Sequence, residues 1–136
     1  MVDSLSNRNW IGESTFFPQE TKLMKYVLLM YANDAERQKN ADQETYQVWN
    51  KFNQEAQASG TLLSSNGVAP NTTATTVRVR DGKTLITDGP FAETHEQLAG
   101  FLMFECKDLD EALAWAAKIP TAKVGSIEVR PLWSPE

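Results

Sequence analysis

Four short runs along the chain have the hydrophobic pattern of β-strands. Residues 24–31 (MKYVLLMY) and 100–105 (GFLMFE) carry apolar side chains at both odd and even positions, which is typical of strands buried on two faces. Residues 126–131 alternate apolar and charged side chains, which predicts an edge strand with one covered face. A weaker run over residues 62–68 indicates one more short strand.

Two stretches with a helical period of apolar residues predict amphipathic helices. The first follows Asn40 and Gln43, which resemble a capping box, and ends at Gly60, where a left-handed glycine is expected. The second begins at Asp108 and ends before Pro120. The apolar stripes comprise Thr45, Val48, Trp49, Phe52 and Ala56 in the first helix and Leu109, Ala112, Leu113, Ala116 and Ile119 in the second.

The clearest local signal is a β-hairpin over residues 75–88, TTVRVRDGKTLITD. Asp81 and Gly82 form the dipeptide that favours a two-residue type I′ turn. This turn fixes the pairing of the two strands and places Asp88 at the end far from the turn. The pairs on one face are Val79 with Thr84, Val77 with Ile86 and Thr75 with Asp88, and the other face carries Arg78, Arg80 and Lys83.

The order of these elements predicts an α+β ferredoxin-like sandwich, an antiparallel sheet with two helices on one face. Two helices of this size can cover only one face of the sheet. The strands over residues 24–31 and 100–105 are nevertheless apolar on both faces. We therefore expect a second copy of the chain to bury the other face, so that the protein is a homodimer.

Composition narrows the class of protein without assigning a function. The 136 residues fit a single domain, and 13 Lys and Arg against 18 Asp and Glu give a net charge of −5, which disfavours nucleic acids and anionic membranes as partners. The single cysteine, Cys106, and the single histidine, His95, exclude a disulfide framework and a multi-histidine metal site within one chain. The sequence contains no phosphate loop and no dinucleotide fingerprint, so we expect no metal and no cofactor.

Residues 1–22 differ from the domain that we place at residues 23–136. They are polar, lack the apolar run of a signal peptide, and are expected to form a flexible extension of a cytoplasmic protein. The other interpretation is that Trp10 and the Phe16-Phe17 pair dock on the domain or on a partner subunit.

A candidate site follows the hairpin, in the segment TDGPFAETHEQLAGF over residues 87–101. Gly89 and Pro90 give the turn a special backbone, and their peptide bond is a candidate for the cis form. A helical turn is possible between Ala92 and Gln97.

On these residues the chain resembles the YCII-related superfamily, in particular the branch named for its DGPF motif. The similarity covers roughly residues 23–133, and its matching segments are 24–31, 77–101, 108–120 and 126–131. The resemblance implies a ferredoxin-like α+β fold and a homodimer of the dimeric α/β-barrel kind. It also implies a regulatory association, since DGPF proteins are often encoded beside extracytoplasmic-function sigma factors.

The resemblance does not carry over the chemistry proposed for the YCII branch. That branch uses a His–Asp pair, and one kind of member is a dehydrochlorinase acting on a muconate-type substrate. Here the first helix carries Tyr46, Trp49 and Asn50 but no histidine, and residues 118–120 (KIP) contain no aspartate. His95 stands where DGPF relatives usually have lysine.

Asp88 and His95 are the candidate catalytic residues. His95 can exchange a proton near neutral pH, and Asp88 can orient an imidazole or bind a substrate group. The alternatives are a solvated loop histidine and an aspartate that bonds its own turn. The spacing of the two residues leaves open whether they meet.

The candidate ligand-binding residues surround this loop or lie on strands. Arg78 and Arg130 can bind an anion, although exposed arginines are common on strands. Phe91 can contact a ligand or plug an interface, and Glu93 can supply a carboxylate or simply charge the start of a helical turn. Cys106 has no activating neighbours in the sequence and is expected to be inert.

Two classes of function are consistent with these residues. The first is a small-molecule-binding protein or enzyme, in which Asp88, His95 and Arg130 converge in a pocket beside the DGPF loop. The second is a non-catalytic regulatory or interaction module associated with a sigma factor, with an apolar surface beyond the dimer interface and an exposed His95.

Overall fold

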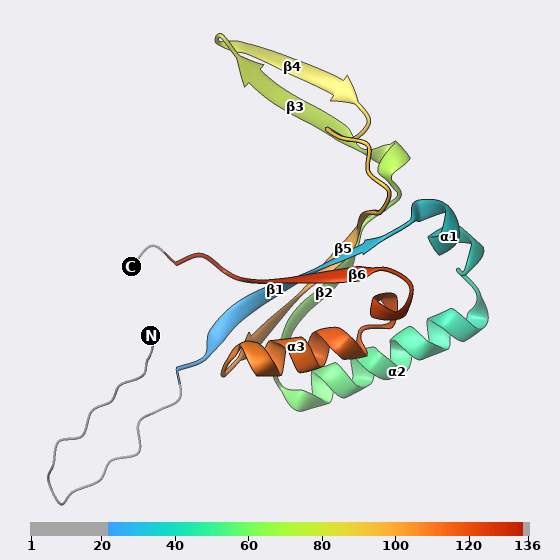
Figure 1. Cartoon of the computed structure of the whole chain (residues 1–136), viewed down its shortest axis with the longest axis vertical. Helices are drawn as coiled ribbons and strands as arrows, with labels where there is room; N and C mark the ends of the chain where they lie inside the picture. Colours follow the sequence, from blue (N-terminus) through green and yellow to red (C-terminus); the bar gives the residue numbers. More distant parts are fainter. Residues whose placement is uncertain (1–21, 135–136) are drawn as a thin grey trace, which may run out of the picture.

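The computed structural model describes residues 22–134, which form a four-stranded antiparallel sheet, a helical layer and a projecting hairpin (Figure 1). The sheet has the order β2-β5-β1-β6, and its strands are β1 (Met24–Ala32), β2 (Leu62–Gly67), β5 (Gln97–Cys106) and β6 (Ser126–Pro131). This is the ferredoxin-like order with a hairpin inserted between its second and third strands, so the predicted fold is confirmed. The expected extension falls, except for Lys22, outside the described residues.

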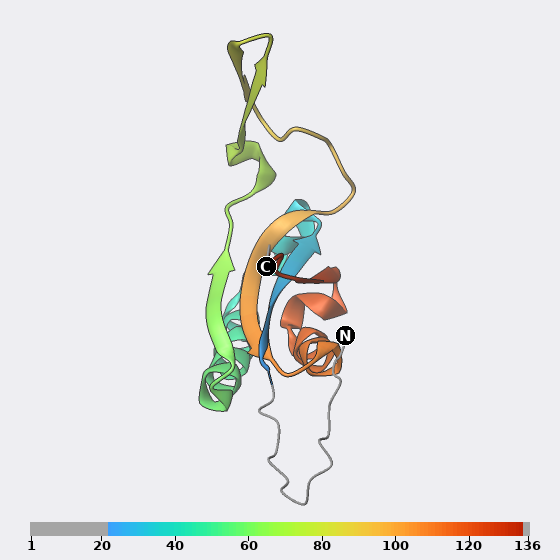
Figure 2. The same cartoon turned by 90° about the vertical axis from the view of Figure 1, so that its left-hand side faces the viewer.

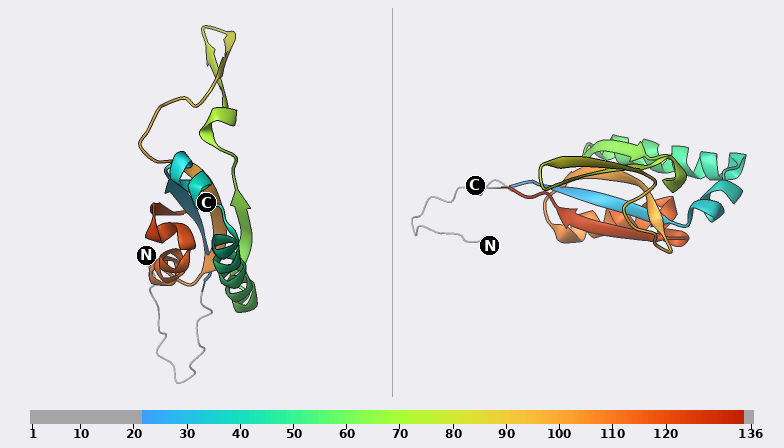
Figure 3. Two further views of the ribbon diagram at one scale, coloured as in Figure 1. Left: turned by 90° about the vertical axis from the view of Figure 1, so that its right-hand side faces the viewer. Right: turned by 90° about the horizontal axis from the view of Figure 1, so that it is seen from above.

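Three α-helices are present among the described residues, one more than predicted. They are α1 (Asp34–Lys39), α2 (Gln43–Ser59) and α3 (Leu109–Lys118), and α2 and α3 lie on one side of the sheet (Figures 1 and 3). None of them is long and apolar enough to cross a membrane.

The helix caps explain where the predicted boundaries were right and where they were wrong. Asp42, not Asn40, caps α2, because its carboxylate accepts a hydrogen bond from the amide of Thr45 at 2.9 Å. Asn40 instead ends α1. The predicted cap of α3 is confirmed by the side chain of Asp108, and the predicted left-handed glycine after α2 by Gly60 at φ 77°.

The core lies between the helices and one face of the sheet. Phe104 and Trp115 stack with ring centroids 5.2 Å apart, and Phe52 meets Trp115 edge to face. The apolar stripes are narrower than predicted, because Val48, Leu109 and Leu113 lie at their exposed margins. The fully or largely buried residues are Tyr26, Leu28, Met30, Ala32, Phe52, Ala56, Ala99, Leu102, Phe104, Cys106, Ala112, Ala116 and Ile119.

The other face of the sheet has no helix over it among the described residues, and we call it the open face. Since successive side chains of a strand alternate, the residues between the buried ones of β1 and β5 point to this side. The apolar members are Val27, Leu29, Tyr31, Phe101 and Met103, each partly exposed. The strands are thus apolar on both faces, as the sequence predicts.

The inserted hairpin, which we call the arm, consists of β3 (Thr75–Arg80) and β4 (Lys83–Asp88). Its register is the predicted one, and Asp81 and Gly82 both have positive φ, 53° and 74°, as a type I′ turn requires. The arm forms a sheet of its own that stands away from the rest of the domain (Figures 1 and 2). All residues from 77 to 88 are exposed.

The backbone just before β6 packs closely against the end of β1, and a glycine substitution there tests the fold. A Cβ added at Gly125 would overlap the carbonyl oxygen of Tyr31, whereas one at Gly67 would meet only ordinary contact distances. We expect Gly125→Ala to lower the free energy of unfolding by about 1–3 kcal/mol, because the backbone of β1 must shift. Gly67→Ala is the control and should change it much less. Equal effects in chemical denaturation would contradict the tight junction of β1 and β6.

Candidate functional site

The DGPF loop, residues 88–96, connects the arm to β5. Gly89 has φ 100°, a value that favours glycine, and its amide donates to the carbonyl of Ala74 at 2.7 Å while its own carbonyl accepts from Thr76 Oγ1 at 2.8 Å. These bonds close the base of the arm. The Gly89-Pro90 bond is trans, and the possible helical turn between Ala92 and Gln97 is absent, because the loop is irregular and β5 already begins at Gln97.

One short helix holds the incoming connection of the arm. Arg37 Nη2 donates to the carbonyl of Val68 at 2.8 Å, and the carboxylate of Asp34 accepts from the amide of Asn71 at 2.7 Å. Asp34 and Arg37 also form an ion pair at 3.5 Å. The side chains of α1 therefore fix the segment that leads from β2 to β3.

The same helix start holds the outgoing connection. The Asp34 amide donates to Gln97 Oε1 at 2.9 Å, and Asn33 Nδ2 donates to the carbonyl of His95 at 3.3 Å. Gln97 in turn donates to the carbonyl of Thr94. Sequence reasoning missed this hydrogen-bonded base, since α1 lies in a polar stretch without an apolar stripe. The signal was Asn33, which caps the amide of Glu36.

Within one chain the predicted catalytic residues remain apart from the predicted arginines. Asp88 lies at the base of the arm and His95 at the end of the DGPF loop, and both are exposed. Among the described residues, no hydrogen bond or ion pair links either side chain to another group. Arg78 lies on the arm, and Arg130 lies on β6. Neither the cavity on the helix side nor the shallower one beside Tyr46 is lined by these residues.

The remaining predicted ligand-binding residues are on the loop and face solvent. Phe91 is 78% exposed, and Glu93 is exposed as well. Of the loop carboxylates, only Glu96 reaches the sheet, where its Oε1 accepts from Ser126 Oγ at 2.9 Å.

A polar edge borders the open face along β6. The register places Ser126, Glu128 and Arg130 opposite Tyr31, Leu29 and Val27, so these side chains share the open face. We call the group formed by Tyr31, Glu96, Ser126, Glu128 and Arg130 the polar edge.

The charges of this edge are partly matched. Arg130 donates through Nε and Nη2 to one carboxylate oxygen of Glu128, at 3.0 and 2.8 Å. This hydrogen bond, with the charge of Glu128, raises the pKa of Arg130 above its usual value. Arg130 is one of the candidate residues from the sequence, and Tyr31, which lies on the neighbouring strand of the same face, was not among the candidates. The apolar-and-charged alternation of residues 126–131, set against β1, was the signal that could have found it.

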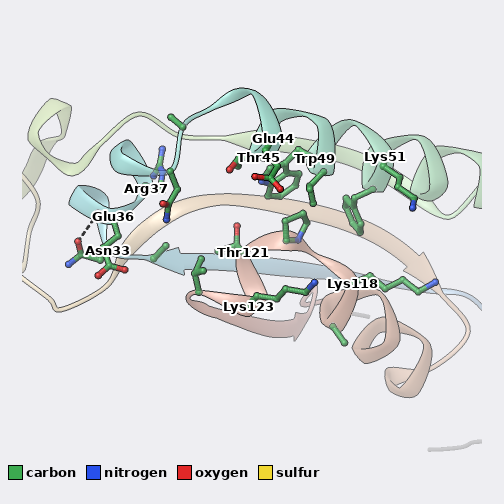
Figure 4. A pocket seen from close by; sticks show the side chains of 18 of the residues that line it. Asn33, Glu36, Arg37, Glu44, Thr45, Trp49, Lys51, Lys118, Thr121 and Lys123 are labelled. Carbon is green, nitrogen blue, oxygen red and sulfur yellow. Dashed lines mark hydrogen bonds between the residues drawn. The ribbon is translucent and has the colours of Figure 1, made fainter.

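A separate cavity of about 840 Å³ lies on the helix side of the sheet (Figure 4). Trp49 of α2 faces it from one side, and Thr121 and Lys123, in the turn after α3, face it from the other. Lys118 at its rim is paired with Glu55 at 2.7 Å. None of the residues predicted from the sequence to bind or react lines this cavity.

Cys106 is fully buried at the end of β5. Burial, with a smaller contribution from the charges of Glu111 and Asp108, raises the pKa of its thiol to about 11. A protonated, inaccessible thiol is a poor nucleophile, which agrees with the inert role predicted for it. The described residues hold no cluster of three or more His, Cys, Asp or Glu suited to a metal ion.

Comparison with known proteins gives two concordant matches. The family model described as the YCII-related domain matches residues 24–135. The chain is also 37% identical over 114 residues to an uncharacterized protein of Rhizobium meliloti (strain 1021), a match that covers 80% of this chain and 92% of that protein.

The base of the arm gives a test by hydrogen exchange. Asp34→Ala removes the acceptor of the Asn71 amide and the partner of Arg37. Leaving these groups unsatisfied costs about 1–3 kcal/mol locally, so we expect amide exchange at Asn71 to accelerate about tenfold or more. Lys39→Ala, at the exposed end of α1, is the control and should leave that rate unchanged. Unchanged exchange in both variants would show that other contacts hold the arm.

The buried thiol gives a second test. Since the pKa of Cys106 rises from 9.0 to about 11 on folding, the stability that it contributes is complete below pH 9 and is lost as the pH rises toward 11. We expect Ellman's reagent to leave native protein unmodified at pH 8 and to react fully in guanidinium. Cys106→Ala should lose less stability between pH 9 and 11 than the unaltered chain. Rapid labelling of native protein would contradict the burial.

Proposed function

This chain belongs to the YCII-related domain family, and we propose that it acts as a homodimer that binds a small molecule on the open face of its sheet. The observation that carries this proposal is the combination of five partly exposed apolar side chains with the polar edge beside them. Ligand sites are mostly apolar, with a few polar groups that fix the orientation of the ligand. The open face has this composition.

The proposal of a homodimer rests on the one face of the sheet that the described helices leave uncovered. Helices α2 and α3 cover one face, and no described element covers the other. An apolar sheet face of this size is costly to leave in water, and a second copy offers an equally apolar face to bury it. The ligand would then lie at the margin of this interface, where the polar edge meets the DGPF loop.

The side chains near this margin have distinct roles in the proposal. Arg130 and Tyr31 hydrogen-bond a polar group of the ligand, while its apolar part lies on Phe101 and Met103. His95 and Asp88, together with Glu93, line the approach from the loop. Phe91 and Arg78 contact the ligand from the loop and from the arm. The proposal concerns binding, because this chain lacks the His–Asp pair of the YCII branch.

A non-catalytic regulatory module is the second candidate. The exposed His95, without a described side-chain partner, and the exposed apolar residues of the arm support it. In this case the chain acts in the cytoplasm through a protein partner, with the sigma-factor association that the DGPF resemblance implies.

Light scattering and thermal shift distinguish these functions. We expect a dimer at micromolar concentration and stabilisation by at least one member of a panel of aromatic alcohols and carboxylates. Arg130→Ala and Tyr31→Phe should each reduce that shift, since each removes a hydrogen-bonding group. Lys123→Ala, on the helix side, is the matched control and should not.

His95→Ala and Asp88→Ala then test the loop separately. If neither alters the shift, the loop residues are not part of the site. A panel without any stabilising compound would favour the second candidate instead, and a monomer in solution would contradict the homodimer.

A further inference from the structure

The arm exposes an apolar stripe that none of the described residues covers. Val77, Val79 and Ile86 share one face and are 59%, 58% and 68% exposed. An isolated two-stranded hairpin is at best marginally stable in water, and an exposed apolar patch usually marks an interaction surface. The stripe therefore requires a partner surface.

Hydrogen bonds hold the two connections at the base of the arm. Asp34 and Arg37 fix one connection, and Asn33 and Gln97 fix the other. In Figure 1, α2 and α3 lie below the sheet and the arm rises above it, on the side of the open face. A second copy lying on the open face would thus stand beside the arm.

A second exposed apolar surface lies at the other end of the sheet. Leu23 and Met24 precede and begin β1, and the amide of Leu132 donates to the carbonyl of Lys25 at 2.9 Å, which brings the end of β6 beside them. Trp133 follows and is 86% exposed. We call these four residues, Leu23, Met24, Leu132 and Trp133, the distal patch.

The arm and the distal patch cannot meet within one chain. The arm leaves the sheet where β2 ends and β5 begins, at the end of β1 that holds Ala32. The distal patch lies at the end that holds Met24. The nine residues of β1 span about 30 Å, so the whole length of the sheet separates the two surfaces.

We propose that two copies of the chain clasp each other, with the apolar stripe of each arm on the distal patch of the other copy. In this dimer a two-fold axis relates the copies, their open faces stack, and the strands of the two sheets run in opposite directions. Each arm then lies at the far end of the other copy's sheet. Each contact then occurs twice, and the assembly closes as a dimer. The clasp rests on the proposed homodimer and specifies its geometry.

The cations of the arm do not lie on the stripe. Arg78, Arg80 and Lys83 share the opposite face of the arm with Leu85, and Asp81 lies in the turn. The contact of the stripe with the distal patch is therefore an apolar one.

The clasp also has a consequence for the proposed site. It brings Trp133 of the second copy close to the DGPF loop, where Phe91 is otherwise exposed. The ligand site at the polar edge is then built from both chains.

Engineered disulfides test the clasp in the full chain. Ile86→Cys is combined with Leu23→Cys, Leu132→Cys or Trp133→Cys, while buried Cys106 stays unmodified. Because a disulfide needs Cα atoms within about 7 Å, only a contact between copies can join these positions. We expect at least one pair to give a covalent dimer on mild oxidation. The same dimer should form when Ile86→Cys and the matching distal single variant are mixed. Leu85→Cys, on the other face of the arm, is the matched control and should not crosslink.

Substitution by glutamate gives an independent measurement. Ile86→Glu should weaken dimerisation at least tenfold by sedimentation, and Leu85→Glu much less, because only Ile86 faces the distal patch. If the chain is dimeric by light scattering but Ile86→Cys crosslinks with none of the three distal positions, the clasp is wrong and the homodimer is retained. A monomer would overturn both. The clasp would also be wrong if Ile86→Cys of one copy crosslinked to Ile86→Cys of the other, or if the crosslinked copies formed open-ended oligomers instead of a closed dimer.

Discussion

The central strands β1 and β5 carry apolar side chains on both faces, and the helices of the described part of the chain cover only one of them. This imbalance governs the rest of the molecule. On the covered face, Phe104 and Trp115 stack in a core that fixes α2 and α3 against the sheet. On the open face, the same strands present an apolar surface that no element within residues 22–134 covers.

The patterns that predicted the fold were those in which local physics and tertiary packing agree. The hairpin register followed from Asp81 and Gly82, since a type I′ turn, with positive φ at both positions, matches the twist of the strands. The edge position of residues 126–131 followed from their alternation. The first helix start was wrong because Asn40 and Asp42 are both good caps, and the choice between them depends on α1, a helix without an apolar face.

The candidate site was less accessible to sequence reasoning, for a different reason. Asp88, His95 and Arg130 were chosen by residue type and by their place near a turn, but the distance between them depends on long-range contacts. The hydrogen bonds of Asp34 and Arg37 decide where the arm and the DGPF loop stand. These bonds join residues more than 30 positions apart, and no periodicity or short motif encodes them.

Because the contacts of α1 hold both connections of the arm, the length of the arm can change without any change in the packing of the core. Two residues added to each strand of the hairpin would lengthen it by about 7 Å and keep its two faces in register, because the side-chain period is two. The sheet, the helices and the α1 contacts would not need to change. The length of the arm can thus change independently of the sheet and helices that carry it.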